Sequence, residues 1–502
     1  MAGHIMAASA DISASRRRWL ALAVLVAAQF MVVLDVAIVN VALPTIKVDL
    51  GFSQESLQWV ITAYSILFGG VLLLGGRMAD LLGRRRLFML GLVLFTASSL
   101  LDGLAWSEAS LIGFRALQGL GAALLAPAAL SILTTTFAEG RERNLALGIW
   151  GAVSGSGGAA GVLLGGVLTS AFSWSWIFFV NVPVGIAVLA LSPVLLRESR
   201  AELAHRHFDT NGAAAITAGL MVLVYALTHA SQHGWVTGET IGLLAAAALL
   251  VLAFVGIELR SQAPLLPLRI FRLRTLSASN LAALLVGAAV FSQFFLLTLY
   301  MQQVLHYSAL QTGVAYLTFT LSIIAFATVS QAVVTRIGIR RVLPVGLALA
   351  AAGLVVDARL PVHGHYFWNL FPAFLLGGVG MAFAFIPMSI GALSGVRPAD
   401  AGVASGLLNT SQQIGGAVGV AVATTIATTF TGHWLTGHPG TSALAPAALT
   451  HGFQVAFYAL AAIAAVAALL SALLVESQPQ APADDALEPG AGDLVPALEE
   501  AA

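Results

Sequence analysis

The sequence predicts an all-α membrane protein whose chain crosses the bilayer fourteen times. Of its 502 residues, 59% are hydrophobic and 9% are charged, whereas an average soluble domain is about 25% charged. Apolar stretches of about 20 residues, the length that spans a bilayer as a helix, recur along the chain. The charged residues lie mainly between these stretches, which excludes an ordinary soluble protein.

Each expected span is an apolar stretch that ends at charged or turn-forming residues. The first stretch, Trp19–Val41, is too long for the core of a cleaved signal peptide, so we expect it to remain as a span. The spans in order are 19–43, 57–76, 87–106, 110–136, 145–171, 175–196, 211–230, 239–258, 276–303, 311–335, 342–360, 367–394, 402–430 and 452–475. An even number of spans places both termini on one side.

The two ends of the chain fall outside the spans. Residues 1–18 form the expected cytoplasmic N-terminus, and their first six residues resemble an expression-vector remnant. Residues 476–502 are rich in Pro, Ala, Asp and Glu. Because such a segment has little apolar surface to bury, we expect a disordered cytoplasmic tail.

The basic residues orient the spans. All but three of the 23 Lys and Arg residues fall at alternate span ends, and therefore on one face of the membrane. Only Lys47 and Arg359 fall on the other face, and Arg115 falls within a span. Since basic residues concentrate on the cytoplasmic side, both termini are expected there.

An internal repeat relates distant parts of the chain. An offset of 258 residues superposes 157–162 on 415–420, and an offset of 255 superposes 83–86 on 338–341. The fifth span is therefore equivalent to the thirteenth, and the loop after the second span is equivalent to the loop after the tenth.

The repeat predicts two homologous six-helix halves, 19–197 and 276–475, with two inserted central helices at 211–259. Transporters built from parallel repeats relate their halves by an axis along the membrane normal. Their substrate site lies between the halves, near the middle of the membrane.

A dense cluster of charge separates the second and third spans. Residues 76–86 read Gly-Arg-Met-Ala-Asp-Leu-Leu-Gly-Arg-Arg-Arg, and we expect them to form a tight loop at the cytoplasmic surface. The segment resembles the loop signature of the major facilitator superfamily, in which Gly76, Asp80, Gly83 and the following basic residues have matching positions. Leu81 stands where a basic residue is usual.

Three further stretches carry the same resemblance. Residues 34–44 resemble the first-helix signature of the fourteen-helix drug:proton antiporters within that superfamily. Residues 115–121 resemble its Arg-x-x-Gln-Gly element. Residues 157–166 resemble its antiporter motif, with Val162 at the usual Pro position.

The resemblance implies a major facilitator fold and proton-coupled efflux of lipophilic or singly charged drugs, or of a natural product, by alternating access. The alternative on the same fold is a facilitator, or a proton symporter that imports a small metabolite. An enzyme would need a paired nucleophile and base or a metal cluster within the spans, and neither is visible. We therefore expect a transporter and not an enzyme.

Asp35 and Arg115 are the expected proton-coupling residues. Asp35 lies about 25 Å along the first span at 1.5 Å per residue, and Arg115 lies a few residues past the outer end of the fourth, so the two lie at similar depth. Charged groups inside a membrane usually pair or face a cavity. We hypothesise a pair that opens when Asp35 is protonated; the alternative is a static ion pair that only fixes helix packing.

A second charged site is expected around Asp80. The thirteenth span starts near Ala401, and its N-terminal dipole presents partial positive charge where Asp80 can reach it. In the superfamily this contact latches the two halves shut on the inside, so the resemblance implies a conformational latch that includes Gly76, Gly83 and Arg84. The alternative is a solvated loop that fixes topology alone.

The fifth span carries a stripe of glycines, Gly157, Gly161, Gly165 and Gly166. Small residues at this spacing allow close helix packing, to which the resemblance adds a role in antiport.

Substrate contacts are expected from the helices that line the cavity in this fold. The candidates are Asn40, Gln118, Gln293, Phe294, Tyr300, Gln302 and Phe385, with Asn409 and Gln412 from the thirteenth span. Aromatic, amide and aliphatic side chains suit amphipathic molecules, although ordinary packing explains each residue as well. No acid falls within the ninth, tenth, twelfth or thirteenth expected span, and Asp357 lies near the outer end of the eleventh. Obligate dications are therefore expected to be poor substrates.

The expected partners are a drug-like small molecule, protons and membrane lipid. No nucleic acid, cofactor or metal is expected, and the protein is expected to be a monomer. The expected location is the bacterial inner membrane, which the chain crosses many times with both termini in the cytoplasm.

Overall fold

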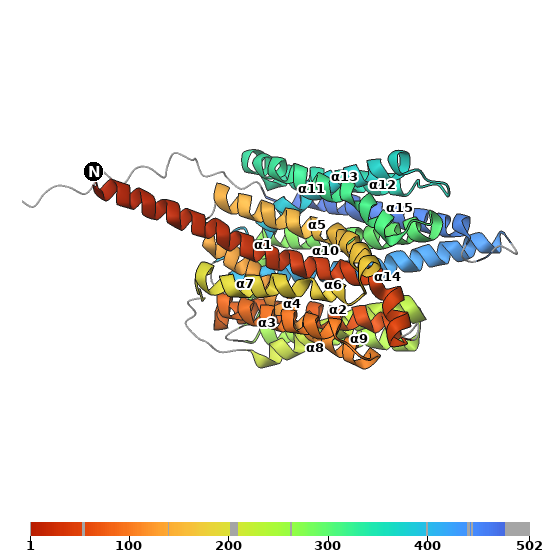
Figure 1. The fold of residues 1–502 in the computed structure, drawn as a ribbon, viewed down its shortest axis with the longest axis horizontal. Helices are drawn as coiled ribbons and strands as arrows, with labels where there is room; N and C mark the ends of the chain where they lie inside the picture. Colours follow the sequence, from red (N-terminus) through yellow and green to blue (C-terminus); the bar gives the residue numbers. More distant parts are fainter. Residues whose placement is uncertain are drawn as a thin grey trace, which may run out of the picture.

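The structure is a computed structural model that describes residues 2–52, 56–138, 140–200, 209–261, 264–397, 400–438, 442 and 445–476. The described residues form long helices that lie side by side in one bundle (Figure 1). Within these ranges thirteen helices are long and apolar enough to cross a membrane. α5, which bends by 42° between Gly158 and Ala160, raises the number to fourteen.

The helices of the first part of the chain are α1 (Ala2–Leu50), α2 (Trp59–Leu82), α3 (Arg84–Gly103), α4 (Glu108–Thr136), α5 (Arg141–Ala171), α6 (Trp176–Phe179), α7 (Asn181–Leu195) and, in the range expected to hold the inserted pair, α8 (Thr210–His233) and α9 (Gly238–Glu258). α6 and α7 together form the sixth span. The short helix η1 (Ser56–Gln58) precedes α2.

The second half contains α10 (Arg274–Leu299), α11 (Ala309–Ile337), α12 (Ile339–Asp357), α13 (Phe371–Ala392), α14 (Ala401–Thr436) and α15 (Pro446–Leu474). A 3₁₀ segment, η2 (Leu268–Arg272), precedes α10. The π-helical turns η3 (Tyr300–Val304) and η4 (Tyr366–Leu370) extend α10 and open α13.

Helices from the N-terminal part of the chain pack on helices from the C-terminal part. α5 packs along α11, and α2 packs along α14. The inserted helices α8 and α9 pack on each other, and α8 also contacts both α2 and α14. The inserted pair therefore lies along the seam between the halves, and in Figure 1 it occupies the side of the bundle opposite α11 to α13.

The charged segment 76–86 differs from its prediction. α2 continues to Leu82 and α3 begins at Arg84, so that only Gly83, with a φ of 114°, lies between the two helices. Asp80 and Arg84 are buried, with relative exposures of 0% and 3%. The expectation of a tight surface loop is therefore wrong, because the segment is helical on both sides of Gly83 and neighbouring helix ends cover Asp80 and Arg84.

Candidate functional site

The Asp35 carboxylate of α1 and the Arg115 guanidinium of α4 form a buried ion pair. Asp35 Oδ2 lies 2.7 Å from Arg115 Nη1, and the two residues have relative exposures of 0% and 1%. A lone charge at this depth costs about 2.5–3.5 kcal/mol on membrane-insertion scales. Pairing offsets part of that cost for each partner.

Amide side chains complete the coordination of Asp35. Gln118 Nε2 donates to Asp35 Oδ1 at 2.8 Å, and Asn181 Nδ2 donates to the same oxygen at 3.2 Å. Gln118 Oε1 also accepts a hydrogen bond from Arg115. Gln118, predicted as a substrate contact, therefore belongs to the ion-pair cluster in this arrangement.

Arg115 also makes two contacts with α2. Arg115 Nε donates to the Val60 carbonyl at 3.1 Å, and the guanidinium lies 4.4 Å from the centre of the Tyr64 ring. Val60 and Tyr64 of α2 and Asn181 of α7 were missed by sequence reasoning, since they lie outside the motifs and only tertiary packing brings them here. The only signal in the sequence for Tyr64 and Asn181 was a polar side chain within an apolar span, which needs a partner when it is buried.

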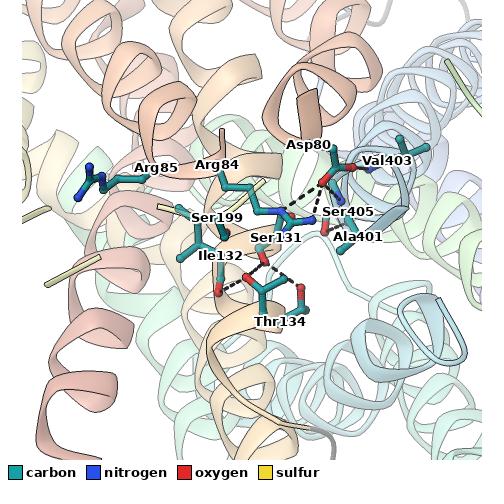
Figure 2. Close-up of polar contacts among 12 residues, drawn as sticks. Asp80, Arg84, Arg85, Ser131, Ile132, Thr134, Ser199, Ala401, Val403 and Ser405 are labelled. Carbon is teal, nitrogen blue, oxygen red and sulfur yellow. Dashed lines mark hydrogen bonds and ion pairs between the residues drawn. The ribbon is translucent and has the colours of Figure 1, made fainter. Parts of the chain in front are cut away.

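The second candidate site is a charged junction between α2, α3 and α14 (Figure 2). Arg84 donates to Asp80 Oδ1 through Nη2 at 2.7 Å and through Nε at 3.2 Å. The backbone N–H groups of Gly402 and Val403 donate to Asp80 Oδ1 and Oδ2, each at 3.2 Å. These groups are the unpaired donors of the first turn of α14, where the helix dipole also favours an anion.

Two glycines make this junction possible. A Cβ at Gly76 would overlap the Gly402 carbonyl, so glycine is required where α2 meets α14. Gly83 has a positive φ of 114°, a conformation that other residues rarely adopt. After it, Arg84 N donates to the Ser199 carbonyl at 3.0 Å, and Glu198, a residue the sequence did not single out, accepts from Arg85 N at 3.2 Å.

The glycine stripe of α5 packs on both sides of Asp35. A Cβ at Gly157 would lie 2.7 Å from Val33 Cγ1, one at Gly161 would lie 2.8 Å from the Leu34 oxygen, and one at Gly165 would lie 2.9 Å from the Ile38 oxygen. Gly166 is buried on the same helix. The stripe therefore holds α5 against the stretch of α1 that carries the carboxylate.

Five of the predicted substrate contacts make local hydrogen bonds or are partly exposed. Asn40 is exposed and donates to the Val36 carbonyl at 3.0 Å, and Asn409 donates to the Ser405 carbonyl at 3.0 Å. Gln302, Phe385 and Gln412 are partly exposed.

The second half brings three of the candidates close to Asp357 and its neighbours. Gln293 Nε2 donates to Asp357 Oδ2 at 2.7 Å, Phe294 stacks on Tyr316 with ring centres 4.8 Å apart, and Tyr300 Oη donates to the Pro361 carbonyl at 2.6 Å. Asp357 has a relative exposure of 0%. The acid placed near the outer end of its span is therefore buried.

The long apolar helices define a multi-pass membrane protein. The family model described as "Major Facilitator Superfamily" matches residues 25–420. The chain belongs to this superfamily, and the all-helical fold predicted from the sequence is confirmed.

Two curated relatives and one solved structure illustrate the match. The chain is 40% identical to "Puromycin resistance protein pur8" of Streptomyces alboniger over 96% of this chain and 95% of the relative. It is 43% identical to "Cephamycin export protein CmcT" of Amycolatopsis lactamdurans over 82% of this chain and 85% of the relative. The human organic anion transporter MFSD10 (TETRAN) has the same fold, with a TM-score of 0.60 and 16% identity over 91% of this chain and 99% of that one.

Proposed function

We propose that the protein exports a lipophilic or singly charged antibiotic-like compound from a bacterial cell in exchange for protons, by alternating access. The observation that carries this proposal is the buried ion pair of Asp35 and Arg115, 2.7 Å apart. The names of relatives support the class of substrate, since they describe resistance to puromycin and lincomycin and export of a cephamycin and of tetracenomycin C.

Protonation of Asp35 changes the free energy of this pair. A neutral carboxylic acid no longer attracts the guanidinium, so the contact that ties α1 to α4 weakens. Each entering proton supplies about 2.3 kcal/mol per 100 mV of membrane potential and about 1.36 kcal/mol per pH unit. One proton can therefore drive a substrate gradient well above tenfold.

The Asp80 junction is the latch in this proposal. It joins α2 of the first half to α14 of the second, and α4 also packs on α14 and α5 on α13. By the positive-inside rule this end faces the cytoplasm, as do both termini. The described arrangement is then the inside-closed state, in which substrate has left the cytoplasm.

Transport by inverted membrane vesicles tests the proposal. With an acidic lumen, vesicles that contain the protein should accumulate at least one of puromycin, lincomycin, tetracenomycin C and a cephamycin, and a protonophore should abolish the accumulation. Vesicles without the protein are the control. Uptake that equilibrates and ignores the protonophore would instead identify a facilitator.

A further inference from the structure

Asp102, three residues from the Ser99 hydroxyl on α3, is a buried acid that the mechanism above does not use. Its relative exposure is 0%, and neither carboxyl oxygen accepts a hydrogen bond from the described residues. An ionised carboxylate without partners is very costly in an apolar interior. The arrangement is compatible with a carboxyl group that carries a proton.

The charged surroundings of Asp102 are those of the ion pair. Arg115 and Asp35 are the charged groups that interact with it electrostatically. The helices packed on α3 are α2, α4, α6 and α7. α2 contributes Tyr64 to this cluster, whereas α6 and α7 contain no titratable side chain.

The packed helices carry three other titratable groups, none of which is among the groups that interact electrostatically with Asp102. Arg77 and Asp80 are at the opposite end of α2, and Glu108 is in the first turn of α4. Asp102 therefore faces one guanidinium and one other carboxyl group.

A chain of hydrogen bonds connects Asp35 to Ser99 of α3. Asn181 Nδ2 donates both to Asp35 Oδ1 at 3.2 Å and to Ser99 Oγ at 3.1 Å. Ser99 Oγ in turn donates to the Phe178 carbonyl at 2.9 Å. Residues three apart on a helix are neighbours on its surface, so Asp102 lies one turn from this network.

We propose that Asp102 is a second proton-binding site and the alternate ion-pair partner of Arg115. In the described arrangement Asp35 is ionised and paired, and Asp102 holds the proton. In the alternate arrangement the O–H bond on Asp102 breaks, an O–H bond forms on Asp35, and the guanidinium moves to the Asp102 carboxylate. One proton, one carboxylate and one guanidinium are present before and after the step.

This exchange solves a problem that a single acid leaves open. Protonation of Asp35 alone strands a buried guanidinium, and breaking a buried ion pair by removing one partner is strongly destabilising. With Asp102 as the alternate partner, the cluster stays neutral and the cost of moving Arg115 falls. The proposal rests on Asp35 as the coupling acid and adds the residue that receives its partner.

Infrared spectroscopy of the full-length protein in lipid tests the shared proton without any transported compound. The readout is the carbonyl-stretch band of protonated carboxyl groups at neutral pH, compared between the wild type and the variants Asp102→Asn and Asp35→Asn. We expect each single variant to lose the same band, because either acid left alone with Arg115 becomes its ionised partner.

Asp357→Asn is the matched control. Asp357 lies 255 residues after Asp102, the offset that superposes 83–86 on 338–341, and it has an unpartnered Oδ1 of its own. Its described partner is the amide of Gln293 instead of a guanidinium. In the Asp357→Asn background, both single variants should still lose the shared band.

Two results would overturn the proposal. If Asp35→Asn keeps the band that Asp102→Asn removes, Asp102 is a permanently neutral structural acid. If Asp102→Asn removes no band, Asp102 is ionised in the wild type. A shared band in a protein whose vesicles show no proton-driven transport would refute the proposed export and leave the shared proton intact, so the two failures are distinguishable.

Discussion

At the scale of single residues, desolvation decides how Asp35 and Arg115 behave. A carboxylate inside a membrane needs hydrogen-bond donors, and Asp35 accepts bonds from Arg115, Gln118 and Asn181. Hydrogen bonds to charged groups contribute about 1.5–3 kcal/mol each. These three hydrogen bonds therefore account for a large part of the interaction energy of the cluster.

The substitution Asp35→Asn should abolish proton-driven accumulation of substrate, since an amide cannot bind and release a proton. Exchange of labelled for unlabelled substrate across vesicles needs no net proton movement, so it should continue. Both rates are measured in inverted vesicles with the transported antibiotic.

Glu239→Gln is the control for Asp35→Asn. Glu239 is an exposed acid at the start of α9, with a side-chain exposure of 68%, and its replacement should change neither rate. Accumulation by Asp35→Asn at the wild-type rate would remove Asp35 from the coupling mechanism.

The depth of Asp35 and Arg115 could be predicted from the sequence, because helical rise per residue is constant. Their rotation about the helix axes could not, since it depends on the packing of neighbouring helices. For the same reason Asn181, Tyr64 and Asp102 did not emerge from the sequence as parts of one cluster. Motif positions were informative for Asp80, but the burial of its segment depends on the contact with α14.

At the scale of helices, glycine determines how closely elements approach. The stripe on α5 meets the α1 backbone at Gly161, whereas Gly158 on the same helix has open space where a Cβ would point. Both positions lie in one helix and both lose the same glycine flexibility when substituted. They therefore separate the effect of contact from the effect of helix propensity.

Gly161→Val should destabilise the protein by about 1–3 kcal/mol, the usual cost of overpacking, and lower transport. Gly158→Val should leave the stability and the transport rate close to those of the wild type. Thermal unfolding in detergent gives the stability, and vesicle transport gives the activity. Equal loss in the two variants would show that the contact with α1 is unimportant.

A second prediction concerns the junction of α2 with α14. Gly76→Leu places a side chain against the Gly402 carbonyl and should hold the Asp80 end open. The chain contains no cysteine, so a single thiol can be introduced as Ser405→Cys, where the native residue has a relative exposure of 0%. Its alkylation by a membrane-impermeant maleimide in inverted vesicles should become several-fold faster in the Gly76→Leu background.

The matched control for this experiment is Gly113→Leu on α4, where no atom lies within 4 Å of the added Cβ. It should leave the alkylation rate of the Ser405→Cys thiol unchanged. If Gly76→Leu also leaves the rate unchanged, the junction does not close the protein at this end.

At the scale of the whole molecule, the inserted helices connect the two halves. Trp59 of α2 stacks on Tyr225 of α8, with ring centres 5.8 Å apart. Trp235, which follows α8, donates from Nε1 to Thr425 Oγ1 of α14 at 2.7 Å. The inserted pair thus contacts one helix of each half, a role that the sequence did not reveal.

Trp235→Phe removes the hydrogen bond to Thr425 and should favour separation of α14 from the inserted pair. A net loss of about 1 kcal/mol corresponds to a roughly fivefold change in the ratio of two conformations, one with α14 in contact with the inserted pair and one with the two apart. Distances between spin labels on α8 and α14 measure that ratio. Trp106→Phe, at a loop residue with 73% exposure, is the control, and equal shifts in both variants would contradict the prediction.

The number and class of helices could be predicted from the sequence because bilayer thickness fixes the length of an apolar span. The arrangement of the inserted pair could not be predicted, since α8 and α9 have no counterpart in the repeat. The continuation of α2 through Asp80 was also missed, because hydropathy alone assigns a charged segment to water.

The position of α5 has a mechanical consequence. One side of this helix is locked to α1 through its glycines, and the other meets α11, where a Cβ at Gly313 would lie 2.6 Å from Leu163 Cα. We therefore expect the spacing of α1 and α5 to stay constant through a transport cycle while α5 pivots on α11. Asp35 on α1 should then move together with α5 as one rigid body in each conformational change.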